Sequence, residues 1–91
     1  MEVDKLVLAL ERTLSFLRES ESSDRANLSV EEVVRQLADE LGKARNSQLL
    51  DLKKLRYLYA PTGSLQEISI YNSWGKEFIE ISNTIDQFTC A

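Results

Sequence analysis

The sequence predicts a mainly α-helical fold, a small bundle of four helices. Apolar residues recur at steps of three and four along four separate segments, and this spacing places them on one side of a helix. Only one proline and three glycines occur among 91 residues, so little interrupts these segments. Hydrophobic residues make up 43% and charged residues 29%, as in a typical globular domain. The predicted helices cover residues 4–20, 30–44, 48–60 and 74–89.

The first predicted helix, residues 4–20, has one main apolar stripe. Leu8 and Phe16 are apolar but fall outside it. A helix that is apolar on more than one side is usually central in a bundle or touches a second chain. The serines and alternating charges that follow predict a flexible loop at about 20–27. The main stripe consists of Val3, Val7, Leu10, Leu14 and Leu17, with Leu6 and Thr13 beside it.

The second predicted helix begins with a capping box. Ser29 is placed to accept a hydrogen bond from the Glu32 N–H, while the Glu32 side chain reaches back to the Ser29 N–H. Leu28 and Val33 flank this pair as a hydrophobic staple. This helix is predicted to end between Gly42 and Asn46. Its buried stripe consists of Val30, Val34, Leu37, Leu41 and Ala44.

The third predicted helix is capped by Ser47 and ends at Ala60, because Pro61 disfavours helical geometry in the residue before it. Its main stripe consists of Leu49, Leu52, Leu55 and Tyr59. A turn and a short extended segment are predicted at 61–72, where Pro61 fixes its own φ angle and Gly63 supplies a positive φ if one is needed.

Residues 64–72 allow two interpretations. Ser64 and Glu67 match a second capping box, which predicts one helical turn at 64–68 and an extended run to Asn72. The alternative is an α+β fold with a short hairpin or strand at 66–71, because apolar and polar residues alternate there.

The last predicted helix carries the heaviest apolar stripe, and either Asn72 or Ser73 is placed to cap it. Large aromatic side chains in this stripe predict that the helix anchors the core of a single domain, residues 1–91. The stripe consists of Trp74, Phe78, Ile81, Ile85 and Phe88.

The composition narrows the function. A net charge of −4 opposes nucleic-acid binding, which needs a basic surface, and no apolar run is long enough to span a membrane. One cysteine, Cys90, cannot form an internal disulfide, and a cytoplasmic location is expected. Without histidine, the commonest general base and zinc ligand is missing, so no cofactor is expected.

Carboxylates offer the one enzymatic alternative, a magnesium-dependent nucleotide hydrolase. Glu31, Glu32, Asp39 and Glu40 would hold Mg²⁺ if they faced inward. This set resembles the paired glutamates of the all-α nucleotide pyrophosphatases, which also carry an E-x-x-D motif on a later helix. Here the E-x-x-D residues, 21–24, precede the predicted second helix.

A second resemblance covers only the segment GSLQEISI, residues 63–70. It is similar to a Gly-Ser-Leu turn segment in a family of small uncharacterised bacterial helical proteins. That resemblance implies structural roles in the turn for Gly63, Ser64, Leu65 and Glu67.

Residues 57–75 are the predicted interaction site. Tyr57, Tyr59, Tyr71 and Trp74 are residue types that dominate binding hot spots, and they cluster around a turn. A non-catalytic domain that binds a protein partner is therefore expected, of an adaptor, regulatory or toxin-neutralising type. The competing interpretation is that these aromatics close one end of the core.

Self-association is a further expectation. Four short helices cannot bury every apolar residue outside their main stripes unless one helix is central, and a homodimer would cover the remainder. The residues in question are Leu8, Phe16, Leu50 and Leu58.

Overall fold

A computed structural model describes residues 2–22, 26, 28–46, 48–60 and 63–89 of the chain. The prediction of a mainly α fold is confirmed, but the described residues form five helices instead of four. They are α1 (Glu2–Arg18), α2 (Val30–Arg45), α3 (Leu52–Leu58), α4 (Ser64–Tyr71) and α5 (Gly75–Thr89).

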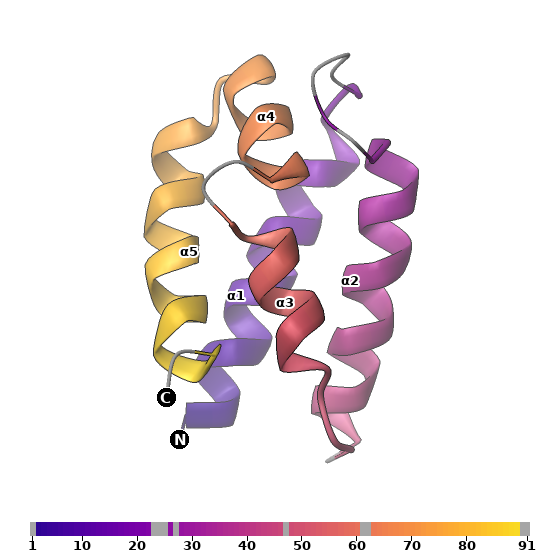
Figure 1. Ribbon diagram of the computed structural model, residues 1–91, viewed down its shortest axis with the longest axis vertical. Helices are drawn as coiled ribbons and strands as arrows, with labels where there is room; N and C mark the ends of the chain where they lie inside the picture. The colour runs from indigo at the N-terminus through magenta and orange to yellow at the C-terminus, as the bar shows by residue number, and fades with distance from the viewer. Residues whose placement is uncertain (1, 23–25, 27, 47, 61–62, 90–91) are drawn as a thin grey trace.

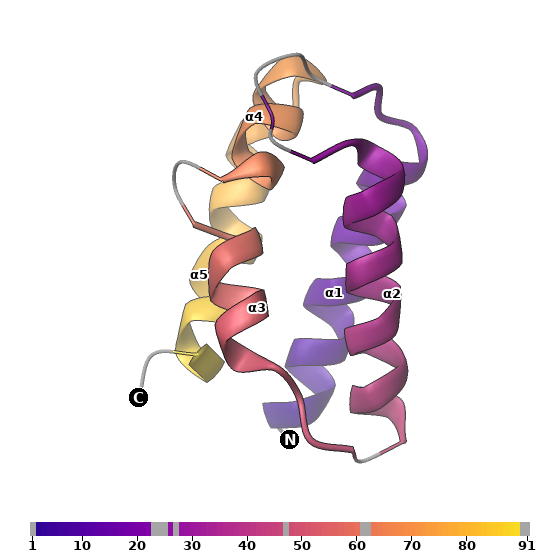
Figure 2. The same ribbon diagram turned by 45° about the vertical axis from the view of Figure 1, so that its right-hand side comes forward.

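The three long helices and the two short ones form a bundle (Figure 1). The two short helices, α3 and α4, follow one another along the front, with α1 behind α3 and with α5 and α2 on either side. Figure 2 shows α1 beside α2 and α3 against α5. The radius of gyration is 12.0 Å, close to the ~12 Å expected of a single domain of this length.

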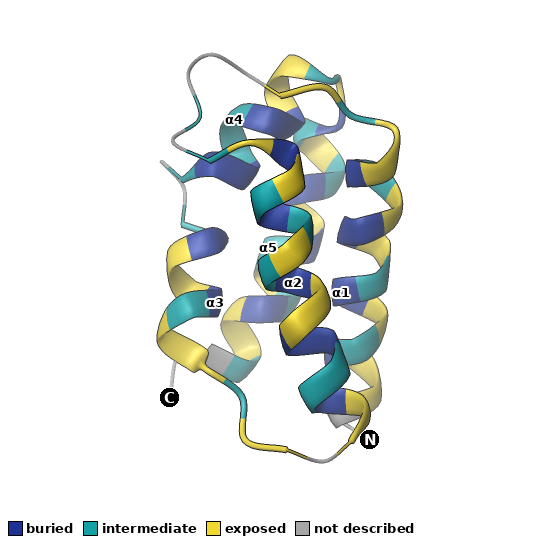
Figure 3. Ribbon diagram, turned by 90° about the vertical axis from the view of Figure 1, so that its right-hand side faces the viewer, coloured by how far each residue is buried: buried dark blue, intermediate teal, exposed yellow. Residues whose placement is uncertain are grey.

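One hydrophobic core receives side chains from all five helices. Figure 3 shows buried and exposed residues alternating along each helix, with the buried ones turned toward the bundle axis. The predicted stripe of α5 is confirmed, since four of its five members are buried and Phe88 packs against the core. The buried members are Trp74, Phe78, Ile81 and Ile85.

The start of α2 agrees with the sequence prediction in part. Ser29 is the N-cap, and its hydroxyl accepts from the Glu32 N–H at 3.2 Å. The Glu32 carboxylate does not complete the capping box, because it is bound by Arg35 and Gln36 one turn later. The Arg35 hydrogen bond lowers the pKa of Glu32 below its ordinary value.

The start of α3 differs from the prediction. Asp51 is the N-cap and accepts from the Lys54 N–H at 3.0 Å, so the helix begins at Leu52 and not at residue 48. The predicted cap, Ser47, lies outside the described residues. Leu49 therefore precedes the helix and is 92% exposed, although its spacing predicted a buried position.

The helical turn predicted at 64–68 is confirmed and belongs to the longer helix α4, Ser64–Tyr71, so the extended run predicted up to Asn72 and the alternative strand at 66–71 are wrong. Leu65 and Ile68 are fully buried one turn apart, while Ile70 is 57% exposed. Burial thus follows the helical period and not the alternation of a strand. Residues 61 and 62, including Pro61, lie outside the described residues.

Gly63 and Ser64 also have different roles from those predicted. Gly63 is the N-cap of α4 with a φ of −86°, so a positive φ is not what requires glycine. A Cβ at this position would lie only 3.0 Å from the Tyr57 carbonyl oxygen and 3.2 Å from that of Ala60. Ser64 does not cap α4, and the predicted capping box with Glu67 is wrong.

Candidate functional site

The four aromatic residues predicted as one binding site divide into two pairs. Tyr59 and Trp74 are 2% and 4% exposed, whereas Tyr57 and Tyr71 are 57% and 61% exposed. The first pair belongs to the core and the second lies on the surface. The interpretation that these aromatics close the core holds for Tyr59 and Trp74, and the exposure that a binding site requires is found only at Tyr57 and Tyr71.

Tyr59 is held in the core through its ring and its hydroxyl. The ring stacks on Phe78 with 6.2 Å between centroids, and the hydroxyl lies 2.7 Å from Thr13 Oγ1. Thr13 donates its only hydroxyl proton to the Ala9 carbonyl at 2.9 Å, so Tyr59 is the donor to Thr13. Burial raises the pKa of the Tyr59 phenol above its ordinary value.

Trp74 closes the end of the core where α1 ends and α5 begins. Its ring stacks on Phe16 with centroids 4.9 Å apart and meets the edge of Phe78 at 6.5 Å. The indole N–H donates to Ser20 Oγ at 2.9 Å. Phe16, which falls outside the main stripe of its helix, is covered by this stacking.

Residues at both ends of the short helix α4 form hydrogen bonds with the connection between α1 and α2. Ser64 Oγ accepts from the Leu28 N–H at 3.0 Å. Asn72 Oδ1 accepts from the Glu21 N–H at 2.9 Å, and its Nδ2 donates to the Glu21 carbonyl at 2.8 Å. Asn72 thus ends α4 as its C-cap and does not cap α5. Ser73 follows it with a φ of 68°, which turns the chain into the last helix.

The predicted flexible loop at 20–27 is described only in part. Glu21 is bound by Asn72, and Ser22 Oγ accepts from the Val30 N–H at 3.0 Å. Residues 23–25 and 27 lie outside the described residues.

The four carboxylates predicted for Mg²⁺ do not share one environment. Glu31 and Asp39 are exposed, Glu32 is bound by Arg35, and only Glu40 is fully buried. In the part of the chain that the structure describes, no group of three or more metal-ligating side chains could hold a metal ion.

Glu40 instead joins α2 to α3. Its carboxylate lies 3.0 Å from Lys43 Nζ and 3.4 Å from Lys54 Nζ, and it accepts from the Asp51 N–H at 2.9 Å. The fully buried negative charge is therefore matched by two ammonium groups and a backbone donor, as a buried charge requires. In the sequence, the i,i+3 spacing of Glu40 and Lys43 is the one local pattern that could have indicated this pairing. Nothing local distinguishes Glu40 from its exposed neighbour Asp39.

The predicted surplus of apolar residues is smaller than expected. Leu58 is 1% exposed, and Phe16 and Leu50 pack against the core. Only Leu8, at 63% exposure, remains on the surface. Of these four residues, Leu8 alone would still need a second chain to cover it, so they give little support for a homodimer.

Exposed apolar side chains are concentrated elsewhere. Among the described residues, seven large apolar side chains are exposed, and five of them lie between residues 49 and 71. These five are close in sequence and lie on or just before α3 and α4, and we call them the outer α3–α4 surface: Leu49, Leu52, Tyr57, Ile70 and Tyr71. The sequence identified the two tyrosines but placed both leucines in the core.

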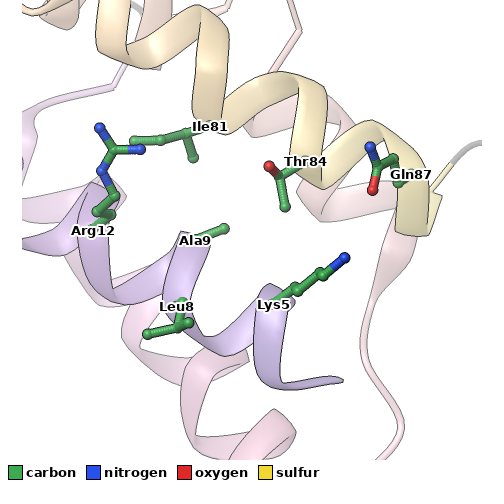
Figure 4. A pocket seen from close by; sticks show the side chains of 7 residues that line it. All are labelled: Lys5, Leu8, Ala9, Arg12, Ile81, Thr84 and Gln87. Carbon is green, nitrogen blue, oxygen red and sulfur yellow. The ribbon is translucent and has the colours of Figure 1, made fainter. Parts of the chain in front are cut away.

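Two grooves flank α5. A groove of about 290 Å³ between α4 and α5 contains Gln66, Phe78 and Asp86. Gln66 Oε1 is buried without a hydrogen-bond partner among the described residues. A second groove of about 350 Å³ lies between α1 and α5 and is drawn in Figure 4. Neither was predicted. The α1–α5 groove combines residues from helices distant in sequence, and the α4–α5 groove depends on how two consecutive helices pack against each other.

No protein-family model, curated protein or solved structure matches the chain. None of the described helices has the length and apolar character needed to cross a membrane.

Proposed function

We propose that this chain is a protein-interaction domain without catalytic activity, and that a protein partner binds the outer α3–α4 surface. The observation that carries the proposal is the concentration of exposed apolar side chains at residues 49–71. Helix α1 contributes one such residue, Leu8, and α5 contributes Ile79. Isolated exposed apolar residues are common, so the support for the proposal is that five of the seven lie within one segment of the chain.

The chemistry of this surface supports the same proposal. Tyr57 and Tyr71 combine large apolar rings with hydroxyl groups, and tyrosine is enriched among residues that dominate binding energy. Lys53 and Arg56 are also exposed on α3. A partner that covers the tyrosines and carries acidic groups at its rim would suit this surface. A second copy of the chain is the alternative occupant, and it would make the domain a homodimer.

The test compares two double variants of the full chain. Tyr57→Ala/Tyr71→Ala removes two exposed rings from the outer α3–α4 surface, and Ile79→Ala/Asn83→Ala removes two exposed side chains on α5. Proteins crosslinked to the wild-type chain in host extract are identified by mass spectrometry, purified and titrated against each variant. Sedimentation at low and high concentration measures self-association.

We expect the tyrosine variant to lose the partner, or the dimer, while its melting temperature stays close to that of the wild type. The control variant should keep the interaction. A chain that remains monomeric at high concentration and captures no partner through these tyrosines would contradict the proposal.

A further inference from the structure

We propose that the groove between α1 and α5 binds an acidic amphipathic helix of a partner protein. This groove is separate from the outer α3–α4 surface, since α1 lies behind α3 in the bundle (Figure 1). The inference therefore does not depend on the function proposed above. It rests on the shape of the α1 wall and on the charges along it.

The α1 wall of the groove has the shape of a hole for a partner side chain. Lys5, Leu8, Ala9 and Arg12 line it, at positions i, i+3, i+4 and i+7 of one helix. Four residues with this spacing form the hole that receives one large side chain in helix–helix packing. Ala9 is small and lies between Lys5 and Arg12, so no long side chain occupies the centre of the wall, although Ala9 itself is only 6% exposed (Figure 4).

The charges at this wall favour an acidic occupant. Lys5 and Arg12 extend from the two ends of the wall toward the groove (Figure 4). They are seven residues apart, which is about 10 Å along the helix axis. Arg12 lies 3.6 Å from Glu80, and both side chains are about half exposed, at 52% and 57%. Lys5 is exposed and makes no ion pair within the described residues.

The opposite wall, on α5, supplies two polar side chains and one buried apolar side chain. Thr84 and Gln87 lie across from Lys5, and Ile81, which is 2% exposed, lies across from Arg12 (Figure 4). Leu8, at 63% exposure, would be covered by an occupant. We expect an occupant helix to direct one leucine at Ala9 and to carry glutamates one turn before and one turn after that leucine. The leucine would fill the hole, and the glutamates would pair with Lys5 and Arg12. This is the helix-in-groove mode of peptide recognition.

The experiment uses a designed peptide as the probe. It is a fluorescein-labelled, alanine-rich helix with a central leucine and glutamates four residues on either side. Two control peptides replace the leucine by alanine or both glutamates by lysine. Binding to the full chain is measured by fluorescence anisotropy, and the contact site is mapped by amide chemical shifts in ¹⁵N-labelled protein.

The matched protein variants are Lys5→Glu and Lys76→Glu. Both residues are exposed and both changes alter the net charge equally, but only Lys5 lines the groove. We expect Lys5→Glu to weaken binding on the order of tenfold and Lys76→Glu to have little effect, because exposed charge contacts act over a short range. Both control peptides should bind more weakly than the probe, and shifts should cluster on α1 and α5.

Three results would overturn the inference. They are equal binding of the three peptides, equal effects of the two variants, and amide shifts confined to α3 and α4. A wild-type dimer that Lys5→Glu dissociates, together with no peptide binding, would assign the groove to a second copy and also overturn it.

Discussion

The inner and outer sides of the α3–α4 region have opposite properties although both are formed by aromatic residues between positions 57 and 74. On the inner side, Tyr59 and Trp74 stack on aromatic rings and direct their polar atoms to Thr13 and Ser20. On the outer side, Tyr57 and Tyr71 expose more than half of their surface. The difference shows that one aromatic-rich segment contributes buried rings to the core and exposed rings to the surface.

The same contrast holds for carboxylates on α2. Glu40 is fully buried between two lysines, while its neighbour Asp39 is exposed and meets the same lysines only at 3.5 and 3.6 Å. Neighbouring residues of similar chemistry therefore have different structural consequences, and pairs of substitutions can measure that difference.

The largest effect is expected for Trp74. Trp74→Ala removes the ring that stacks on Phe16 and leaves a cavity at the end of the core, so it should cost about 3–5 kcal/mol of unfolding free energy. Tyr71→Ala removes an exposed ring and should change it by less than about 0.5 kcal/mol. Urea denaturation of both variants measures the contrast. Equal losses would show that Tyr71 also belongs to the core.

A smaller effect is expected for the buried carboxylate. Glu40→Gln keeps an oxygen for the Asp51 N–H but leaves Lys43 and Lys54 without their buried negative charge. Because both lysines are partly exposed, the loss should be about 1–3 kcal/mol. Asp39→Asn is the control and should cost less than about 1 kcal/mol, as exposed pairs do. Chemical denaturation that ranks Asp39→Asn above Glu40→Gln would contradict the role of Glu40.

The smallest effect is expected for the Tyr59 hydroxyl. Tyr59→Phe removes its bond to Thr13 and should cost about 0.5–1.5 kcal/mol near neutral pH. Burial raises the folded-state pKa of this phenol above its unfolded value near 10. Its contribution is therefore complete below about pH 10 and is lost as pH rises toward the folded-state pKa.

The pH dependence of the free energy of unfolding at alkaline pH tests whether the Tyr59 phenol is responsible. Free energies of unfolding measured at several pH values above about 9 should fall less steeply for Tyr59→Phe than for the wild type. Tyr57→Phe changes an exposed ring and should leave the wild-type slope intact. If both variants flatten the slope equally, the buried phenol is not its source.

Much of the helical architecture could be predicted from the sequence. The cap of α2 at Ser29 and the aromatic and aliphatic stripe of α5 were predicted because each depends on residues within one or two helical turns. A helical turn was predicted at 64–68, but the second half of α4 was predicted as extended. Ile68 and Ile70 alternate with polar residues over a stretch too short to show a helical period.

What only the tertiary structure decided are the contacts that distinguish the inner from the outer side. The Tyr59–Thr13, Asn72–Glu21 and Trp74–Ser20 hydrogen bonds join residues 46, 51 and 54 positions apart. Periodicity within a helix shows that a side is apolar, but the helices packed against it determine which of its side chains are covered. The sequence alone therefore determined the amphipathic helices, whereas the packing of the helices against one another decided which aromatic residues are buried and which remain exposed.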